Sequence, residues 1–160
     1  MQLPAIAHHI HRITAALCQA LLTLIVVGQL SVVILRYVFG IGFIELQEAV
    51  TYSFAALVVL AIPVAQHDDL HVRVDVLRDH QSPKTRHLID RAALILLLIP
   101  VFGLTAWMVW PDVAYSWSIF EGSVEAGGLP GVFLVKSCLP LACVLMVIQG
   151  IAGWWSRQDG

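Results

Sequence analysis

The sequence predicts an all-α integral membrane protein, a single domain over residues 1–160 with four transmembrane helices. Two observations lead to this fold class. The chain is 59% hydrophobic and only 12% charged, with a mean hydropathy of +0.83, so it has too little polar material to cover a globule of 160 residues. Four apolar segments also approach or exceed the roughly 20 residues that cross about 30 Å of hydrocarbon as a helix. They cover about residues 14–35, 49–66, 92–110 and 132–154.

The apolar segments are predicted to be helices, and prolines mark where they start, bend and end. Backbone N–H and C=O groups find no partners in lipid, and the segments lack the alternation of a closed barrel, so each must be a helix. Ser82 before Pro83 resembles an N-cap followed by proline at the first helical position, so a helix from Pro83 should run directly into the third span. Pro111 is predicted to end that helix, whereas Pro100 and Pro140 lie inside spans and predict kinks.

The distribution of basic residues predicts which side of the membrane each loop occupies. Arg12 precedes the first span and Arg157 follows the fourth, and only Arg36 lies at the opposite ends of the spans. Five further basic residues lie between the second and third spans: Arg73, Arg78, Lys84, Arg86 and Arg91. Since short loops rich in Lys and Arg stay on the cytoplasmic side, both termini and the central loop should be cytoplasmic, and residues 36–48 and 111–131 should face outward.

The central cytoplasmic segment 70–79, with the sequence LHVRVDVLRD, can be interpreted in two ways. Its valines alternate with polar residues, which suits a strand, but Leu70, Val74 and Leu77 also form a helical stripe. A lone strand at a membrane surface would have no partner, so an amphipathic helix in the headgroup region is favoured. The five basic residues between the spans would then contact anionic phospholipid headgroups, each contact being worth about 1 kcal/mol.

None of the eleven carboxylates or seven histidines falls inside the four apolar segments. Helices without such groups at mid-depth have no evident means to move a proton, hold a coupling ion or ligate a haem. The clustered His8, His9 and His11 match no metal-site spacing. We therefore expect a component of a larger membrane machine, without enzyme activity, cofactor, metal or nucleic-acid partner.

Two alternatives remain open at this point. A self-sufficient small transporter would need an acid inside the membrane, and a membrane-anchor subunit of a redox enzyme would need ligands in its spans. Transport by the purified chain alone would indicate the first. A haem absorption band in the purified protein would indicate the second.

Lys136 is the only charged residue within a predicted span, about four residues, or roughly 6 Å, from the outer end. Its ammonium could reach the interface without a partner, it could form an ion pair with Glu48, Glu121 or Glu125, or it could contact the substrate directly. Glu48 begins the second helix, where the helix dipole alone would favour a carboxylate. Glu121 and Glu125 lie in a glycine-rich loop, where they could meet an external protein or have no specific role. These four residues are the candidates for a polar network on the outer side.

Several short motifs occur in order between about Arg36 and Ile151. They are Arg36-Tyr37-x-Phe39, Glu48, His71-Val72-Arg73-Val74-Asp75, Ser116-Trp117, Glu121-Gly122-Ser123, Gly127-Gly128-Leu129-Pro130, Lys136-Ser137, Pro140 and Gln149-Gly150. In this order and spacing the sequence resembles the small membrane subunit, of the DctQ type, of tripartite ATP-independent periplasmic (TRAP) transporters, in the branch labelled for mannitol or chloroaromatic compounds. Many family members have an acid, an arginine and a tryptophan where this chain has Gln47, Thr51 and Ala56. These differences weaken any inference from the sialic-acid-type branch about the contacts made at these positions.

The resemblance implies a role in a three-part importer of the bacterial inner membrane. A periplasmic binding protein would capture an organic acid, and a large membrane subunit would move it by a sodium-driven elevator motion. The small subunit would brace the static scaffold of the large one, and the substrate and sodium sites would belong to the large subunit. Glu48, Glu121, Glu125 and Lys136 would then order the outer loop below a docked binding protein.

Overall fold

The structure is a computed structural model and describes residues 3–67 and 83–156. The described residues form helices and no strand: α1 (Leu3–Val38), α2 (Ile44–His67), α4 (Pro83–Ala93), a π-helical turn η1 (Leu94–Leu98), α5 (Ile99–Ser118) and α6 (Val132–Ser156). Four helical stretches are long and apolar enough to cross a membrane: Ala7–Val38, Ile44–His67, Arg91–Ser118 and Val132–Gly153. The prediction of an all-α protein with four transmembrane helices is therefore confirmed.

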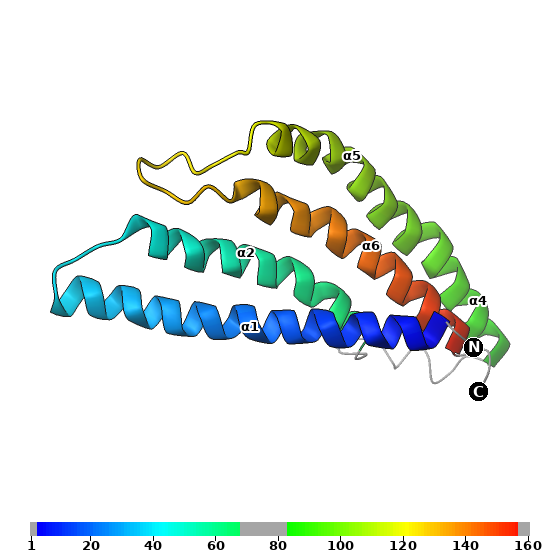
Figure 1. Cartoon of the computed structure of the whole chain (residues 1–160). Helices are drawn as coiled ribbons and strands as arrows, with labels where there is room; N and C mark the ends of the chain where they lie inside the picture. Colours follow the sequence, from blue (N-terminus) through cyan, green and yellow to red (C-terminus); the bar gives the residue numbers. More distant parts are fainter. Residues whose placement is uncertain (1–2, 68–82, 157–160) are drawn as a thin grey trace.

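The long helices lie side by side in a row, in the order α1, α2, α6, α5 (Figure 1). The core lies where α2 and α6 meet α1, around the buried side chains of Leu60, Ala142 and Leu145. Ile10 and Cys18 of α1 pack against this core. The beginning of α1, the ends of α2 and α6, and α4 all lie at the same end of the row (Figure 1). We call this the inner end, and we call the end with the 39–43 and 119–131 connections the outer end.

The third span is one continuous helical path from Pro83 to Ser118, as predicted for its start. The prediction that Pro111 ends it is wrong, because α5 continues for two further turns. A proline inside a helix removes one hydrogen bond and crowds the preceding turn. Here Val113 and Ser116 beyond the proline are buried, and α5 packs along α6, so packing keeps this stretch helical.

Pro100 is accommodated by a change of helix type. It has no N–H to donate to the carbonyl of Leu96, and its ring would crowd that carbonyl. The helix widens just before it into η1, where the Ile99 N–H donates to the Leu94 carbonyl, five residues back. Leu94 is buried and lies against Gly150 of α6, where an added methyl group would be 3.1 Å from the leucine. Pro140 lies inside α6, which continues as an α-helix on both sides of it.

Two further sequence predictions concern the ends of elements. α1 begins at Leu3, well before the predicted start of the first span at about Thr14, because the amphipathic residues before it continue the same helix. The segment 70–79 lies outside the described residues, so its predicted amphipathic helix remains a prediction.

Candidate functional site

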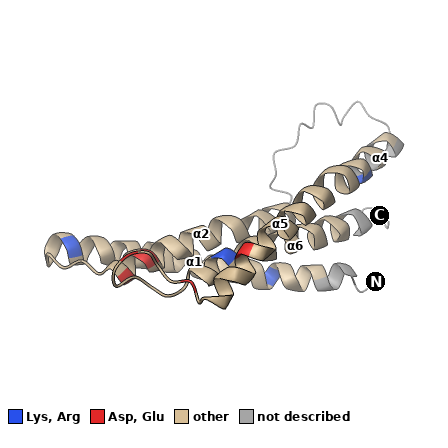
Figure 2. Ribbon diagram, turned by 90° about the horizontal axis from the view of Figure 1, so that it is seen from above, with Lys and Arg blue, Asp and Glu red and all other residues tan. Residues whose placement is uncertain are grey.

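Polar contacts gather at the outer end, where the connection of residues 119–131 folds back over the ends of three helices. The ribbon of the long helices is nearly free of charged residues between their ends (Figure 2). α2 contributes Glu48 and Tyr52, α5 contributes Asp112, and α6 contributes Lys136. Two anchors result, one built on a carboxylate and one on an ammonium group.

The first anchor is Glu48, one turn inside α2. Its Oε2 accepts a hydrogen bond of 2.5 Å from the backbone N–H of Leu129, and its Oε1 accepts one from the Ser123 hydroxyl. Tyr52 lies one turn further along the same face of α2 and donates to the Leu129 carbonyl at 3.4 Å. Gly128 lies directly against this carboxylate, since an added methyl group there would be 2.5 Å from Oε2. The loop is thus wrapped around one side chain of α2.

The loop also bonds to itself around this anchor. The Ser123 N–H donates to the Leu129 carbonyl at 3.2 Å, and the Gly128 N–H donates to the Glu125 carbonyl at 3.0 Å. The Ser123 hydroxyl accepts the Glu125 N–H at 3.0 Å. Gly127 has a φ of +83°, a conformation that glycine adopts without strain. The loop therefore has a defined path over Glu48.

The second anchor is Lys136, one turn inside α6. Its Nζ donates to Oε2 of Glu121 at 2.7 Å and lies 3.4 Å from Oδ2 of Asp112. The side chains of Lys136 and Glu121 are each about a third exposed, whereas that of Asp112 is mostly exposed. The hydrogen bond from Lys136 lowers the pKa of Glu121. Lys136 thus ties the loop and α5 to the start of α6.

The end of α5 is fixed by a helix-capping motif and aromatic contacts. The Phe120 N–H donates to the Trp117 carbonyl and the Glu121 N–H to the Ser116 carbonyl, as in a Schellman motif, with Phe120 at a φ of +46°. Glycine usually takes this position, but the Phe120 ring packs edge-on against Phe133 of α6. Trp117 packs on the same ring at a centroid distance of 4.7 Å and donates from Nε1 to the Ser137 hydroxyl. These contacts place Glu121 beside Lys136.

The four candidates of the predicted outer network therefore have different surroundings. Of the carboxylates considered for Lys136, the structure pairs it with Glu121, whereas Glu48 accepts from loop groups instead. The side chain of Glu125 is exposed, and its backbone takes part in the loop. Sequence analysis missed Asp112, because a helix ending at Pro111 would have left it in a loop. A helix that continues places Asp112 one turn before Ser116, on the side of α5 that faces α6.

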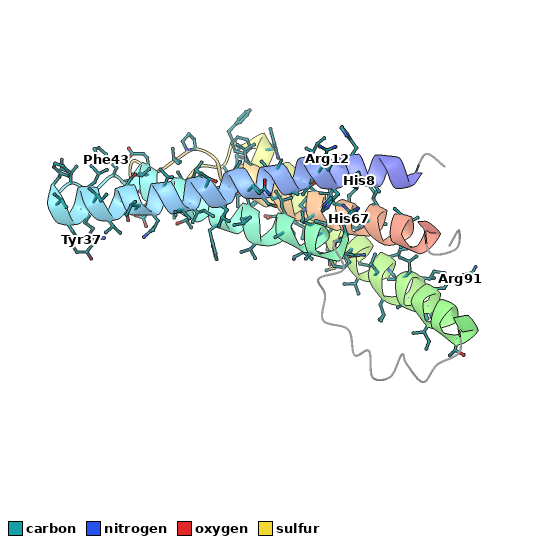
Figure 3. The ribbon with its side chains drawn as sticks, turned by 90° about the horizontal axis from the view of Figure 1, so that it is seen from below. His8, Arg12, Tyr37, Phe43, His67 and Arg91 are labelled. Atoms are coloured by element: carbon teal, nitrogen blue, oxygen red, sulfur yellow. The ribbon has the colours of Figure 1, made fainter. Side chains whose placement is uncertain are left out.

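The predicted headgroup contacts are only in part within the described residues. Arg73 and Arg78 lie outside them, while Lys84, Arg86 and Arg91 are on α4 at the inner end. Arg91 is exposed (Figure 3). Headgroup binding by the five basic residues stays a prediction.

A second polar cluster lies at the inner end, between α1 and α2. His11 is buried and its ring stacks on that of His67 at a centroid distance of 3.8 Å, with His8 close to both (Figure 3). Sequence analysis considered the histidines only as possible metal ligands and did not predict the stack of His11 on His67, which comes from the next helix. Within residues 3–67 and 83–156, no group of three His, Cys, Asp or Glu side chains is placed to hold a metal ion.

One comparison with known proteins yielded a match. The family model described as "Tripartite ATP-independent periplasmic transporters, DctQ component" matches residues 22–160. No curated protein and no solved structure matched the chain. The matched region includes α2, α5, α6 and both outer anchors.

Proposed function

Because this chain belongs to the DctQ family, the small membrane component of TRAP transporters, we propose that it is the static brace of a sodium-coupled importer of organic acids. Members of this family lie in the inner membrane and work with a large membrane subunit and a periplasmic binding protein. In the proposed division of labour, the large subunit moves the substrate and sodium, and the small one holds the immobile part of the transporter at a fixed depth.

The observation that carries this proposal is the absence of ionisable groups at mid-depth. Lys136 is the only charged residue of the four predicted apolar segments, and it lies near an outer end with its ammonium bonded to Glu121. A coupling ion or an anionic substrate needs polar groups along its path through the membrane. In the described spans Glu48, Asp112 and Lys136 lie within about two turns of the outer helix ends and not at mid-depth, which supports a path through the partner subunit.

The outer loop supports a second part of the proposal, a platform for the binding protein. Both anchors hold the loop on the helices, while Val124 is fully exposed at its tip and Glu125 is exposed beside it. A loop held in one conformation loses little conformational freedom when a partner docks. We propose that Glu48, Glu121 and Lys136 fix the loop, that Glu125 faces the binding protein, and that this end is periplasmic with both termini cytoplasmic.

The decisive experiment is uptake into proteoliposomes containing purified components. Liposomes with the large subunit, this chain and the binding protein should take up the organic acid in response to a sodium gradient. Omitting this chain should abolish most uptake, and this chain alone should give none. Transport by this chain alone would overturn the proposal in favour of a self-sufficient transporter, and a haem band in its absorption spectrum would favour a redox anchor.

We further propose that Arg73, Arg78, Lys84, Arg86 and Arg91 hold the central segment against anionic phospholipid. The position of Arg91 on the exposed surface of α4 at the inner end supports this. Replacing all five residues with glutamine should shift the transporter's dependence on phosphatidylglycerol content in proteoliposomes. Uptake with an unchanged dependence would remove this part of the proposal.

A further inference from the structure

The exposed surface of α1 carries two side-chain amides within the apolar part of the helix. α1 stands at one edge of the row, and no described helix lies over it in the view from its side (Figure 3). The side that packs on α2 is marked by Gly28, where an added methyl group would be 2.8 Å from a methyl of Val50. At 3.6 residues per turn, Gln19 lies about 180° and Gln29 about 100° around the helix from Gly28, and both side chains are exposed.

The two amides differ from the hydroxyl groups of the same helix. Thr23 donates to the Gln19 carbonyl at 2.9 Å and Ser31 to the Val27 carbonyl at 2.8 Å, so the helix itself satisfies both hydroxyls. A glutamine side chain has two N–H donors and an acceptor oxygen, more than its own helix backbone can satisfy. Among the described residues, the side chains of Gln19 and Gln29 have no hydrogen-bond partner. Hydrocarbon would leave them unsatisfied, which is unfavourable.

The spacing of the amides defines a stripe. Gln19, Leu22, Val26, Gln29 and Val33 follow each other at intervals of three and four residues. The three apolar members are between 41% and 59% exposed. A repeat of 3.5 residues follows one side of a helix that crosses another helix at about 20°. The stripe is about 21 Å long at 1.5 Å per residue, which suits contact with one transmembrane helix.

α5, at the opposite edge of the row, lacks such a stripe. Within η1 and α5, the exposed side chains of Leu97, Val101, Leu104 and Met108 are apolar. Trp107 and Trp110 are also exposed, and they lie at the outer end of the predicted span, where tryptophan is common at the membrane interface. Thr105 is satisfied by the Val101 carbonyl at 2.7 Å. Lipid tails can cover the apolar side chains, and the headgroup region can accept the indole N–H groups of the two tryptophans. The two edges of the row therefore call for different neighbours, lipid at α5 and polar protein groups at α1.

We infer that the α1 stripe, formed by Gln19, Leu22, Val26, Gln29 and Val33, is the surface on which a transmembrane helix of the large subunit docks. The inference rests on the proposed function, which supplies the identity of the partner. The two amides exchange hydrogen bonds with polar side chains or exposed carbonyls of that helix. The valines and leucine between them pack against its apolar side chains.

The first test is photo-crosslinking in native membranes that contain the whole transporter. A photoreactive phenylalanine derivative replaces Val26, which is 59% exposed, or its matched control Val101 on α5, which is 53% exposed. We expect irradiation at position 26 to give an adduct identified by mass spectrometry as this chain joined to the large subunit, at least fivefold stronger than at position 101. Equal adducts at both positions, or an adduct of two copies of this chain at position 26, would overturn the inference.

The second test removes the amides without changing their size. The double variant Gln19→Leu, Gln29→Leu should lower the large subunit retained by this chain in mild detergent by roughly fivefold to tenfold, since two interhelical hydrogen bonds are lost. The matched control Thr105→Val on α5 should retain it. Full retention by the double variant would contradict the inference. If the unaltered chain retains no large subunit at all, the proposed function itself fails, which separates the two outcomes.

Discussion

The outer and inner ends of the helix row are held together by different forces. At the outer end, Glu48 and Lys136 reach loop groups and carboxylates through directional hydrogen bonds. At the inner end, the packing of Leu60 and Leu145 and the stacked imidazoles of His11 and His67 join α1, α2 and α6. The outer end should therefore respond to charge and pH, and the inner end to side-chain volume.

This difference matches the surroundings in which each end would work. A water-soluble partner can approach the outer end, where the loop conformation is set by a few polar groups that a single substitution can remove. The inner core lies within the membrane-spanning part, where helices associate by close packing. Substitutions at the two ends should thus separate binding of the periplasmic partner from stability of the helix row.

The largest effect is expected from the inner core. Leu60→Ala removes a side chain that is 2% exposed and leaves a cavity among α1, α2 and α6, which should lower stability by about 2–3 kcal/mol. Thermal unfolding of the purified complex in mild detergent measures this loss. The control Ile62→Ala, on the same helix but 41% exposed, should be nearly neutral. A variant as stable as the unaltered protein would show that the inner end is not held by this core.

The second effect concerns Glu48 at the outer end. Glu48→Gln removes the carboxylate charge, so neutral hydrogen bonds to the Ser123 hydroxyl and the Leu129 N–H replace two charge-assisted ones, a loss of about 1–2 kcal/mol. Hydrogen exchange of residues 119–131 should become faster, and the binding protein should bind roughly tenfold more weakly. The control Glu45→Gln, an exposed residue in the first turn of the same helix, should change neither. Unaltered exchange would refute the anchor role of Glu48.

The third effect is smaller and depends on pH, through the pair of Lys136 and Glu121. The pKa of Glu121 in the folded protein is below its ordinary 4.5, so the pair stabilises the loop above that pH and this contribution is lost as the pH falls through the lowered pKa. Hydrogen exchange of the loop should quicken on acidification in this range, after correction for intrinsic exchange. In the Lys136→Met variant, the loop amides should exchange faster above pH 4.5, and their exchange should depend less on pH.

Parallel titrations of two variants decide whether this pair is the source of the pH dependence. Glu121→Gln should flatten the response in the same way as Lys136→Met. Glu125→Gln serves as the control, because its side chain is exposed in the same loop and should leave the response intact. An identical acid response in all variants would assign the effect to other groups.

Sequence patterns predicted the spans because length and hydrophobicity are local properties of a segment. They predicted wrongly at Pro111, where the tertiary packing of Val113 and Ser116 outweighs the local effect of the proline. The π-helical turn before Pro100 was also not predicted. Either a kink or a widened turn can relieve the clash between a proline ring and the carbonyl four residues earlier, and the sequence does not decide between them.

At the outer end, residue types indicated polar candidates but could not name their partners. Lys136 had three possible carboxylates in the sequence, and only the path of the loop selects Glu121. Glu48 bonds to a hydroxyl and to the backbone N–H of Leu129, 81 residues away. Every residue except proline has a backbone N–H, so the residue type does not indicate such a partner. The stack of His11 on His67 was missed for the same reason, because it depends on how two helices meet.

The smallest expected effect isolates docking from the structure of the loop. Glu125 contributes backbone groups to the loop, but its side chain is exposed, so Glu125→Lys should leave thermal stability and loop exchange unchanged. If this residue faces the binding protein, reversing its charge should slow association a few-fold at low salt and much less at high salt, with dissociation almost unaltered. Stopped-flow binding to the reconstituted transporter measures both rates. Equal association rates at low salt would remove Glu125 from the docking surface and leave the two anchors as purely structural supports of the loop.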